Sequence, residues 1–450
     1  MANSLFVISD LHIGANDDFD IFKSVTKLTL FAGFIERIRQ HDSPVELIIN
    51  GDFVDFLQLP PWNDLSRPAA QDKIRRIVKG SADVFRIIGS VLADGRHRIR
   101  VLLGNHDAEM AYPEVWAVLR DAMAPDAGER LKLFDERTTY NVPMNGAVVH
   151  IEHGNADDPW NAINYQPLFH DAETGTANFS YPPGTKFVYE TINQFKEELK
   201  FVDLLKPEVP AVPLLLMALR PRLAARSLPN AAMSALDSLQ NSFLSKLRER
   251  ISGAQFGPGG QIRPSSSLED EMAKVYVGDD SSASYADAED VQSFLESSES
   301  GLARTEKVFG PKMEKIKRRI LARALSSLER HHQQDENFFQ ADHPSNVVAR
   351  SAQKRLAGNV KVVVYGHTHE ALKTEFPEGI YVNSGAWANI VRLPSGDAQS
   401  QLTWLDRLGD NSFERTSFPT YVKVEPSMQV SLCEWTHTGE RTLWQSAISR

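Results

Sequence analysis

The sequence predicts an α/β protein in which strands and helices alternate. Three short apolar runs rich in β-branched residues, at 5–9, 46–50 and 98–103, have the composition of buried strands. Amphipathic segments at 20–40 and 72–92 separate them, which is the order expected of a parallel sheet with crossover helices. Polar residues follow each strand directly. A site is therefore expected at the carboxyl edge of the sheet, where open α/β sheets place their sites.

Further elements are expected along the rest of the chain. They are a helix at 113–123, antiparallel strands within 131–142, and strands at 147–152, 359–365 and 379–382. Alternating runs within 401–442 suggest a second sheet packed on the first. Residues 159–358 have mainly helical patterns, with a Gly-, Pro- and Ser-rich stretch near 253–300 that predicts a mobile loop. We therefore expect 1–158 and 359–450 to form one domain that carries a large helical insertion or cap.

Composition limits the class of protein. The chain has 450 residues, 42% of them hydrophobic and 24% charged, as in globular domains, and it is too long for one minimal core. A net charge of -10 argues against a dedicated nucleic-acid binder but leaves room for a local basic groove. Cys433 is the single cysteine, so any metal must be held by His, Asp, Glu or Asn. The N-terminus lacks a signal-peptide pattern and the apolar run 210–219 is too short to span a bilayer, so a cytoplasmic protein is expected.

The first two strands each end in candidate metal ligands. Asp10 and His12 follow the first strand two positions apart, so in extended backbone both side chains point the same way. A carboxylate with an imidazole suits a divalent metal, although a capping Asp beside a surface His would also explain this pair. Asp52 follows Gly51 after the second strand and is a further candidate ligand. Asp55 is expected to orient a neighbouring ligand or to cap the next helix.

Later strands end in the same way. Gly104 closes the third strand and is followed by Asn105, His106 and Asp107, a composition that a plain turn would also explain. The strand at 147–152 ends in His153 and Gly154.

The strongest local pattern is Gly366-His367-Thr368-His369, because two imidazoles at i and i+2 directly follow a strand and a glycine. Each of these strand ends has an ordinary structural explanation when it is taken alone. Their repeated placement after apolar strands predicts one shared metal site.

The ordered motifs resemble those of a known family. They are D-x-H (Asp10, His12), G-D-x-x-D (Gly51, Asp52, Asp55), G-N-H-D (104–107), H-G (153–154) and G-H-T-H (366–369). Together they resemble the motifs of the calcineurin-like metallophosphoesterases, in the same order. The resemblance covers roughly 4–158 and 359–390, and it does not extend to the insertion.

The resemblance implies a four-layer α/β/β/α sandwich with a binuclear metal centre. The implied ligands are Asp10, His12 and His369 for the first metal, Asn105, His153 and His367 for the second, and Asp52 as the bridge. Oxygen and nitrogen ligands without sulfur suit Mn²⁺, with Fe or Zn²⁺ as alternatives. A hydroxide that bridges the metals would be the nucleophile, and His106 would protonate the leaving oxygen or stabilise the transition state. Asp55 and Asp107 would fix the orientation of ligands.

The implied function is hydrolysis of a phosphodiester or phosphomonoester bond in a phosphorylated substrate. The first motif, at 9–14, also resembles the UDP-diacylglucosamine pyrophosphatases and the nucleases of double-strand-break repair. A nucleotide-sugar-lipid pyrophosphatase and a nuclease therefore remain alternatives, and a catalytically silent protein-binding scaffold is a third. Basic clusters at 220–226 and 312–319 are either solvated helix faces or contacts to an anionic substrate or a membrane surface.

Overall fold

The computed structural model describes most of the two ends of the chain. The described residues are 3–204, 347–391 and 398–448, apart from 63, 65, 135–137, 159–160, 166–168, 170–180 and 201. The chain divides into two compact units: the first comprises 1–204, 335–392 and 413–450, and the second comprises 205–334 and 393–412. Within the second unit the structure describes helix α15 (Ala398–Gly409) and the residues up to 412. The helices, mobile loop and basic clusters expected between 205 and 346 lie outside the described residues.

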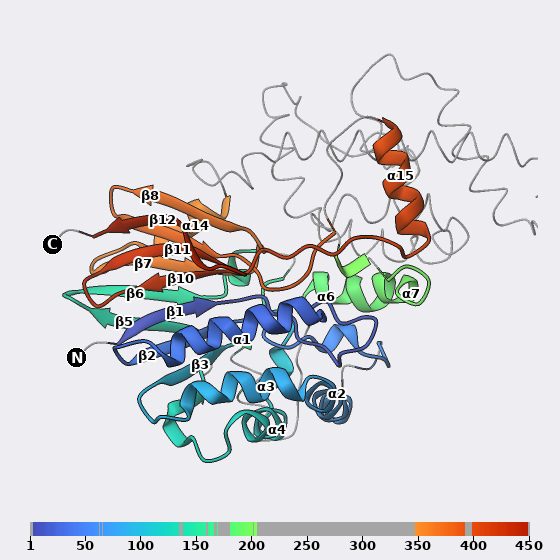
Figure 1. Cartoon of the computed structure of the whole chain (residues 1–450), viewed down its shortest axis with the longest axis horizontal. Coiled ribbons are helices and arrows are strands. Elements are labelled where there is room, and N and C mark those ends of the chain that lie inside the picture. Colours follow the sequence, from blue (N-terminus) through green and yellow to red (C-terminus); the bar gives the residue numbers. More distant parts are fainter. Residues whose placement is uncertain are drawn as a thin grey trace, which may run out of the picture. The chain divides into compact units, whose positions relative to one another are not determined.

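Two sheets form the framework of the first unit (Figure 1). In spatial order, one contains β12 (Gly439–Ala447), β11 (Gln429–Thr436), β10 (Thr420–Val424), β1 (Ser4–Ile8), β2 (Val45–Asn50), β3 (Arg98–Leu102) and β4 (Leu131–Leu133). The other contains β5 (Thr139–Met144), β6 (Ala147–Glu152), β7 (Val360–Tyr365), β9 (Gly379–Ser384) and β8 (Ala371–Phe376). The mixed α/β prediction is confirmed. Neighbours pair in parallel from β1 to β4 and from β6 to β9.

The helices of the first unit differ from the expected ones mainly at their ends. They are α1 (Val25–Arg39), α2 (Arg67–Gly80), α3 (Ala82–Gly89), α4 (Pro113–Met123), α6 (Pro183–Phe187), α7 (Asn193–Phe195) and α14 (Val347–Arg355), with a π-helical turn at Val188–Ile192. α1 begins five residues later than predicted, because the Asp20 carboxylate accepts the amides of Phe22 and Lys23 in a tight turn. The helix predicted at 72–92 is divided at Ser81, whose hydroxyl donates to the Gly14 carbonyl at 2.7 Å.

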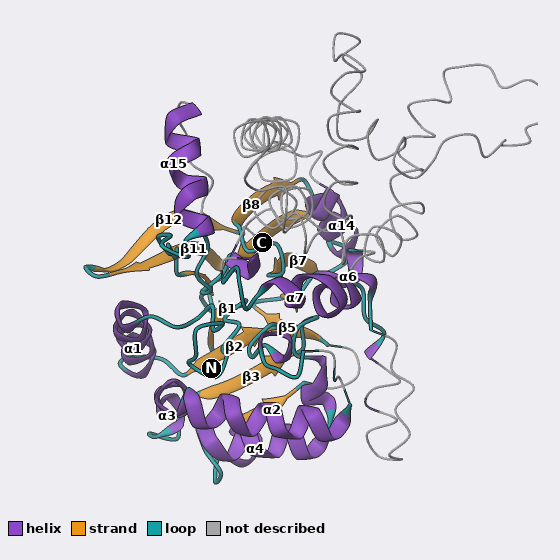
Figure 2. Cartoon of the chain, turned by 90° about the vertical axis from the view of Figure 1, so that its right-hand side faces the viewer, coloured by secondary structure: helices purple, strands orange, loops and turns teal. Residues whose placement is uncertain are grey.

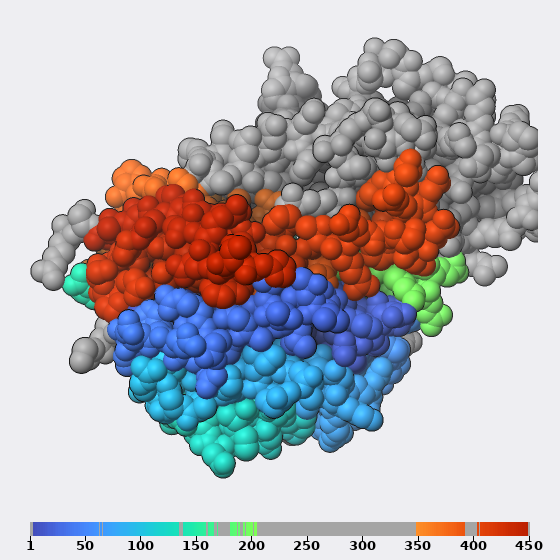
Figure 3. Space-filling view, viewed as in Figure 1, coloured from blue at the N-terminus to red at the C-terminus, as the bar shows by residue number. Residues whose placement is uncertain are grey.

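Two expectations about the strands were wrong. The C-terminal strands extend the first sheet instead of forming a second one, since β10 pairs antiparallel with β1. Figure 3 shows the C-terminal strands, in red, directly against the N-terminal elements, in blue. β10 is buried at four of its five residues, as a strand with partners on both sides is. β4, expected in an antiparallel part, runs parallel to β3, whereas β5 pairs antiparallel with β6 as predicted.

The first part of the 401–442 segment is helical rather than extended. α15 covers residues 398–409, where Trp404 and Leu408 stand at the helical spacing of four. The structure also adds a strand that the sequence pattern did not reveal, β8, which forms a hairpin with β9.

Among the described residues, three apolar cores hold the first unit together. One joins α1–α4 to a face of the first sheet through residues such as Phe6, Leu47 and Val101. The alternate residues of the same strands, such as Leu5 and Ile48, face the second sheet in another core. A third, smaller core packs α14 on the remaining face of β7 and β9. Figure 2 shows α1–α4 together on one side of the strands and α14 beside β7 on the other. Both sheets are therefore fixed rigidly, and so are the loops at their carboxyl ends.

Lys27 in α1 carries an unusual burial cost. Its side chain is 1% exposed, its Nζ lies 5.0 Å from the centre of the Phe22 ring, and it has no hydrogen-bond partner among the described residues. Burial lowers the pKa of Lys27 well below 10.5, although the nearby Asp20 carboxylate opposes this.

We expect Lys27→Met to raise the free energy of unfolding at pH 7 by about 1–3 kcal/mol, the usual cost of an unsatisfied buried polar group. The pKa of Lys27 is lower in the folded protein than in the unfolded chain, where it is roughly 10.4. The wild-type protein therefore loses stability as the pH falls below about 10.4, because only the unfolded chain then binds the proton. The stability gained by Lys27→Met should therefore be smaller near pH 10.4 than at pH 7. Denaturant unfolding at pH 7 and near pH 10.4 measures it. Lys23→Met, at a side chain that is 41% exposed, is the control and should change stability little.

Candidate metal centre

The predicted ligands lie where loops from both sheets meet. Backbone bonds join these loops: the amides of Asp10 and His12 donate to the carbonyls of Gly51 and Asp52, and the Gly366 amide donates to the His153 carbonyl. The Ser9 hydroxyl, after β1, lies 2.8 Å from the hydroxyl of Ser384, at the end of β9. The carboxyl ends of strands in the two sheets thus form one continuous edge.

The backbone at this edge is strained. Ten described non-glycine residues have positive φ, and five of them are predicted ligands: Asp10, His12, Asp52, His367 and His369, with φ between 49° and 70°. A left-handed conformation costs roughly 1–2 kcal/mol per residue and persists only where the surroundings impose it. Residues in this conformation concentrate at functional sites. In the described part of this chain, half of them are predicted ligands.

Four predicted ligands form a tight buried cluster. The ligand atoms of Asp10, His12, Asp52 and His369 all lie within 4.8 Å of one another. His369 Nε2 is 3.2 Å from Asp10 Oδ1 and 3.1 Å from His12 Nε2, which in turn is 3.5 Å from Asp52 Oδ2. Two carboxylates and two imidazoles can hold a divalent ion at this point.

The other three predicted ligands lie beside this cluster. His153 Nε2 is 3.3 Å from Asp52 Oδ2, and its Nδ1 is 2.8 Å from the Asn50 carbonyl. That carbonyl only accepts, so it fixes the proton on Nδ1 and leaves Nε2 facing Asp52. The rings of His153 and His367 lie 5.3 Å apart. Asn105 is buried and its Nδ2 donates to Asn161 Oδ1 at 3.5 Å.

The donor atoms fit a metal ion. Asp10 Oδ1, Asn105 Oδ1 and His153 Nε2 are buried and have no hydrogen-bond partner within the described part of the chain. Leaving such atoms unsatisfied costs about 1–3 kcal/mol each, so native proteins nearly always satisfy them. All three belong to the predicted ligand set. Oxygen and nitrogen donors of this kind match a divalent cation that prefers hard or borderline ligands.

Electrostatics keep the carboxylates of the cluster ionised. Burial alone would raise the pKa of Asp52, but the imidazoles of His153, His106 and His12 hold it well below its usual range. The pKa of Asp10 is lowered as well, by His369 and His153 against the effect of burial. In return the Asp52 and Asp10 carboxylates raise the pKa of His153 to about 9, although burial opposes this.

Asp55 contacts both His12, a predicted metal ligand, and His106, the predicted general acid. Its Oδ2 lies 2.9 Å from His12 Nδ1 and 3.0 Å from His106 Nδ1, and it also accepts from Gln58 Nε2 at 2.9 Å. Its Oδ1 caps a short 3₁₀ helix by accepting the Leu57 amide. The imidazole of His106 is 21% exposed, more than those of the predicted ligand histidines. The arrangement holds that imidazole by Nδ1 at the rim of the cluster.

The side chain of Asp107 accepts hydrogen bonds from backbone amides. Its two carboxylate oxygens accept the amides of Gly104 and Phe53 at 2.7 and 2.6 Å, which ties the loop after β3 to the loop after β2. Burial, together with the Asp52 carboxylate, raises the pKa of Asp107 well above 3.8. Its contacts are therefore those of a loop clamp rather than of a partner to an imidazole.

Two glycines leave room for the ligands. A β-carbon at Gly104 would collide with the Asp52 carboxylate, and one at Gly51 would collide with the His153 ring. Gly51 also has φ +81, a conformation that L side chains rarely adopt.

Sequence reasoning missed four residues of this region. Asp158 Oδ2 lies 3.0 Å from His367 Nε2 and accepts from Asn161 Nδ2 at 2.7 Å. Asn383 Nδ2 donates to the Gly366 carbonyl and to Thr368, and Gln58 holds Asp55. Asn383 is the next-to-last residue of β9, and this position near the end of a strand could have identified it as a candidate site residue. The other three do not directly follow a strand, so the strand-end rule could not find them.

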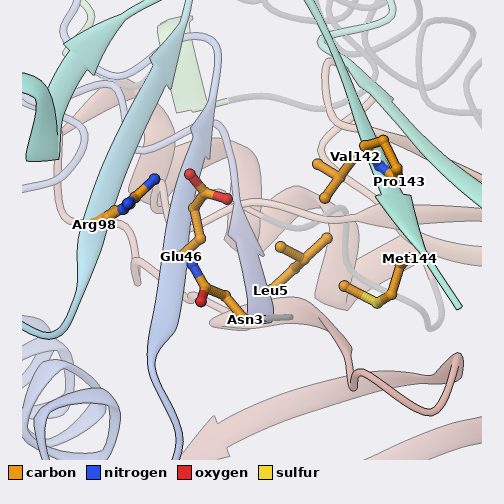
Figure 4. A pocket seen from close by; sticks show the side chains of 7 residues that line it. All are labelled: Asn3, Leu5, Glu46, Arg98, Val142, Pro143 and Met144. Carbon is orange, nitrogen blue, oxygen red and sulfur yellow. The ribbon is translucent and has the colours of Figure 1, made fainter. Parts of the chain in front are cut away.

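A described cavity lies away from the predicted site. It has a volume of about 280 Å³ and is lined by Asn3, Leu5, Glu46, Arg98, Val142, Pro143 and Met144. Figure 4 shows β5 residues on one side of it and residues of the other sheet facing them. Several of these residues begin β1, β2 and β3, so the cavity lies near the amino ends of those strands and contains none of the predicted site residues.

Comparison with known families agrees with the geometry. Residues 4–176 match the family model described as calcineurin-like phosphoesterase. This match supports the metallophosphoesterase superfamily for residues 4–176, in agreement with the resemblance of the motifs. No curated protein matches the chain. In the described part of the chain, no helix has the length and apolar character needed to cross a membrane.

We expect Gly104→Ala to lower the content of bound divalent metal, because the added methyl group must displace the Asp52 carboxylate. The overpacking should also cost about 1–3 kcal/mol of stability. Metal analysis of the dialysed protein and denaturant unfolding give the two readouts. Gly33→Ala is the matched control, since Gly33, like Gly104, has no positive φ, and the nearest atom to its β-carbon position is Trp435 Nε1 at 3.4 Å. A Gly104→Ala protein with wild-type metal content would show that this close approach is not needed.

Proposed function

We propose that the protein is a hydrolase of phosphoester bonds that works with two divalent metal ions. The observation that carries the proposal is the buried cluster of Asp10, His12, Asp52 and His369 beside the partly exposed His106. Two ions, when bound, would neutralise the charge of a phosphoryl group and make a bound water acidic enough to attack it. The family match supports this class of reaction.

The proposed ligand assignment follows the two parts of the site. Asp10, His12 and His369 would hold one ion, and Asn105, His153 and His367 the other, with Asp52 shared. The Asp52 carboxylate faces imidazoles of both sets, His12 at 3.5 Å and His153 at 3.3 Å. Mn²⁺ is our proposal for the ions, with Fe or Zn²⁺ as alternatives.

His106 is the proposed general acid. Asp55 contacts its Nδ1 at 3.0 Å and so orients the ring, which would give a proton to the leaving oxygen or bind the phosphoryl group. Its backbone amide donates to Asp52 Oδ1 at 2.9 Å, which fixes the ring's position relative to the bridging carboxylate. The imidazole is thus positioned by two carboxylates that also contact His12.

The scaffold in this proposal is a helix–sheet–sheet–helix sandwich with an insertion. The three successive cores support the order of its layers. The insertion would select the substrate, which we take to be a phosphorylated molecule.

His106→Asn should lower kcat by about 10²–10⁴-fold, the usual contribution of a positioned proton donor, without removing metal. Turnover of a chromogenic phosphodiester and a chromogenic phosphomonoester by the Mn²⁺-loaded protein measures it. His150→Asn is the control, because His150 pairs with Asn141 on the neighbouring strand, away from the cluster. Full activity in His106→Asn would refute the proposed role. Failure of the metal-loaded wild-type protein to hydrolyse either ester, or a pyrophosphate, would favour the scaffold alternative.

Asp52→Asn should lose both metal and rate, since an amide carries one acceptor oxygen and no charge to share between two ions. Metal content and kcat are measured on the same preparation, and thermal unfolding checks that the protein is folded. Unchanged metal stoichiometry in Asp52→Asn would contradict the bridging role.

A further inference from the structure

A chain of polar contacts joins two proposed ligands of the second ion. His367 Nε2 lies 3.0 Å from Asp158 Oδ2, and the same oxygen accepts from Asn161 Nδ2 at 2.7 Å. Asn161 Oδ1 in turn accepts from Asn105 Nδ2 at 3.5 Å. The links therefore run from His367 to Asp158, to Asn161 and to Asn105.

Local backbone contacts hold Asp158 and Asn161 in place. The carbonyl of Asp158 accepts the amides of Asn161 and Ala162 at 3.0 and 2.7 Å. The side chain of Asn155 donates to the Asn161 carbonyl and to the Tyr165 hydroxyl, both at 2.9 Å. Because Asn155 and Tyr165 are buried, the segment after β6 is anchored to the domain and not only to itself.

The carboxylate of Asp158 sets the direction of every link. An ionised carboxylate only accepts, so Asn161 must present its NH₂ group to Asp158 and its oxygen to Asn105. Asn105 must then present its own NH₂ group to Asn161. This leaves its Oδ1, buried and without a hydrogen-bond partner among the described residues, as the atom available to a metal ion.

The same argument fixes the tautomer of His367. Its Nε2 faces an acceptor and must carry the proton, so Nδ1 is left with the lone pair that a metal ligand needs. One carboxylate thus prepares both an amide oxygen and an imidazole nitrogen for coordination. Hydrogen bonds of this kind to ligands commonly raise metal affinity by about 10–100-fold.

We propose that Asp158 and Asn161 are positioning residues for the second metal ion, a role that rests on the proposed two-ion function. They act through His367 and Asn105 and do not bind the first ion. Asp55 has the corresponding place at the first ion, where it accepts from His12 at 2.9 Å. The carboxyl of Asp158 is 33% exposed, so the second half of the site is open to solvent on this side.

The test is a count of bound Mn²⁺ on the full-length protein, stripped of metal and titrated while free Mn²⁺ is followed by electron paramagnetic resonance. The wild-type protein should bind two ions per chain. Asp158→Ala and Asn161→Ala should keep one ion at wild-type affinity and bind the other about 10–100-fold more weakly. Asp158→Asn should recover most of the loss, because its amide oxygen can still accept from both His367 and Asn161.

A neighbouring carboxylate supplies the matched control. Asp157 pairs with Arg355 and accepts from the Tyr365 hydroxyl, so Asp157→Ala should keep both ions at wild-type affinity. Thermal unfolding of each variant checks the fold, and if Asp158→Ala does not fold, Asn161→Ala still carries the test.

Three results would overturn the inference, and they separate it from the proposed function. Wild-type affinity for both ions in Asp158→Ala and Asn161→Ala would refute the positioning role and leave the proposed function standing. An equal loss of affinity for both ions would show that the two residues support the whole site rather than one half. A wild-type protein that binds fewer than two ions would contradict the two-ion function itself.

Discussion

The site depends on the contacts that the Asp52 carboxylate makes. It accepts the His106 amide, faces His12 and His153, and is buried at the end of β2. Loops after β1, β2 and β3 in one sheet and after β6 in the other therefore converge on one side chain. A buried charge is tolerated only where it is paired, and here the pairing comes from imidazoles and an amide on different strands. The packing of the two sheets thus determines where the charged groups meet.

The site could be predicted from sequence where the chain's own geometry carries the information. An apolar strand followed directly by polar residues, in most cases beside a glycine, defines both the end of the strand and the edge of the sheet at which those residues lie. That rule located Asp10, Asp52, Asn105 and the three later histidines, and all of them lie along one edge of the structure. The helix predicted at 113–123 and the strand predicted at 147–152 have the observed limits of α4 and β6.

The parts that could not be predicted depend on contacts distant in sequence. β10 has the pattern of any buried strand, and only the open side of β1 determines that it joins the first sheet. Asp158 and Asn161 follow no strand directly, and their role depends on His367, more than two hundred residues away. The left-handed φ of His367 and His369 is likewise imposed by the surroundings, since histidine does not favour this conformation by itself.

The pairing of β1 with β10 has a consequence for how the chain reaches this structure. Leu5 lies opposite Val424, so β1 receives one of its two neighbours only after the long intervening part of the chain has been synthesised. Closure entropy grows only with the logarithm of the intervening length, so the long connection adds little to the equilibrium cost. Its effect is on timing: until β10 arrives, one row of amides and carbonyls of β1 stays unpaired and available to other chains. His369 is likewise synthesised 357 residues after His12, so Asp10 and His12 await their partners over that interval.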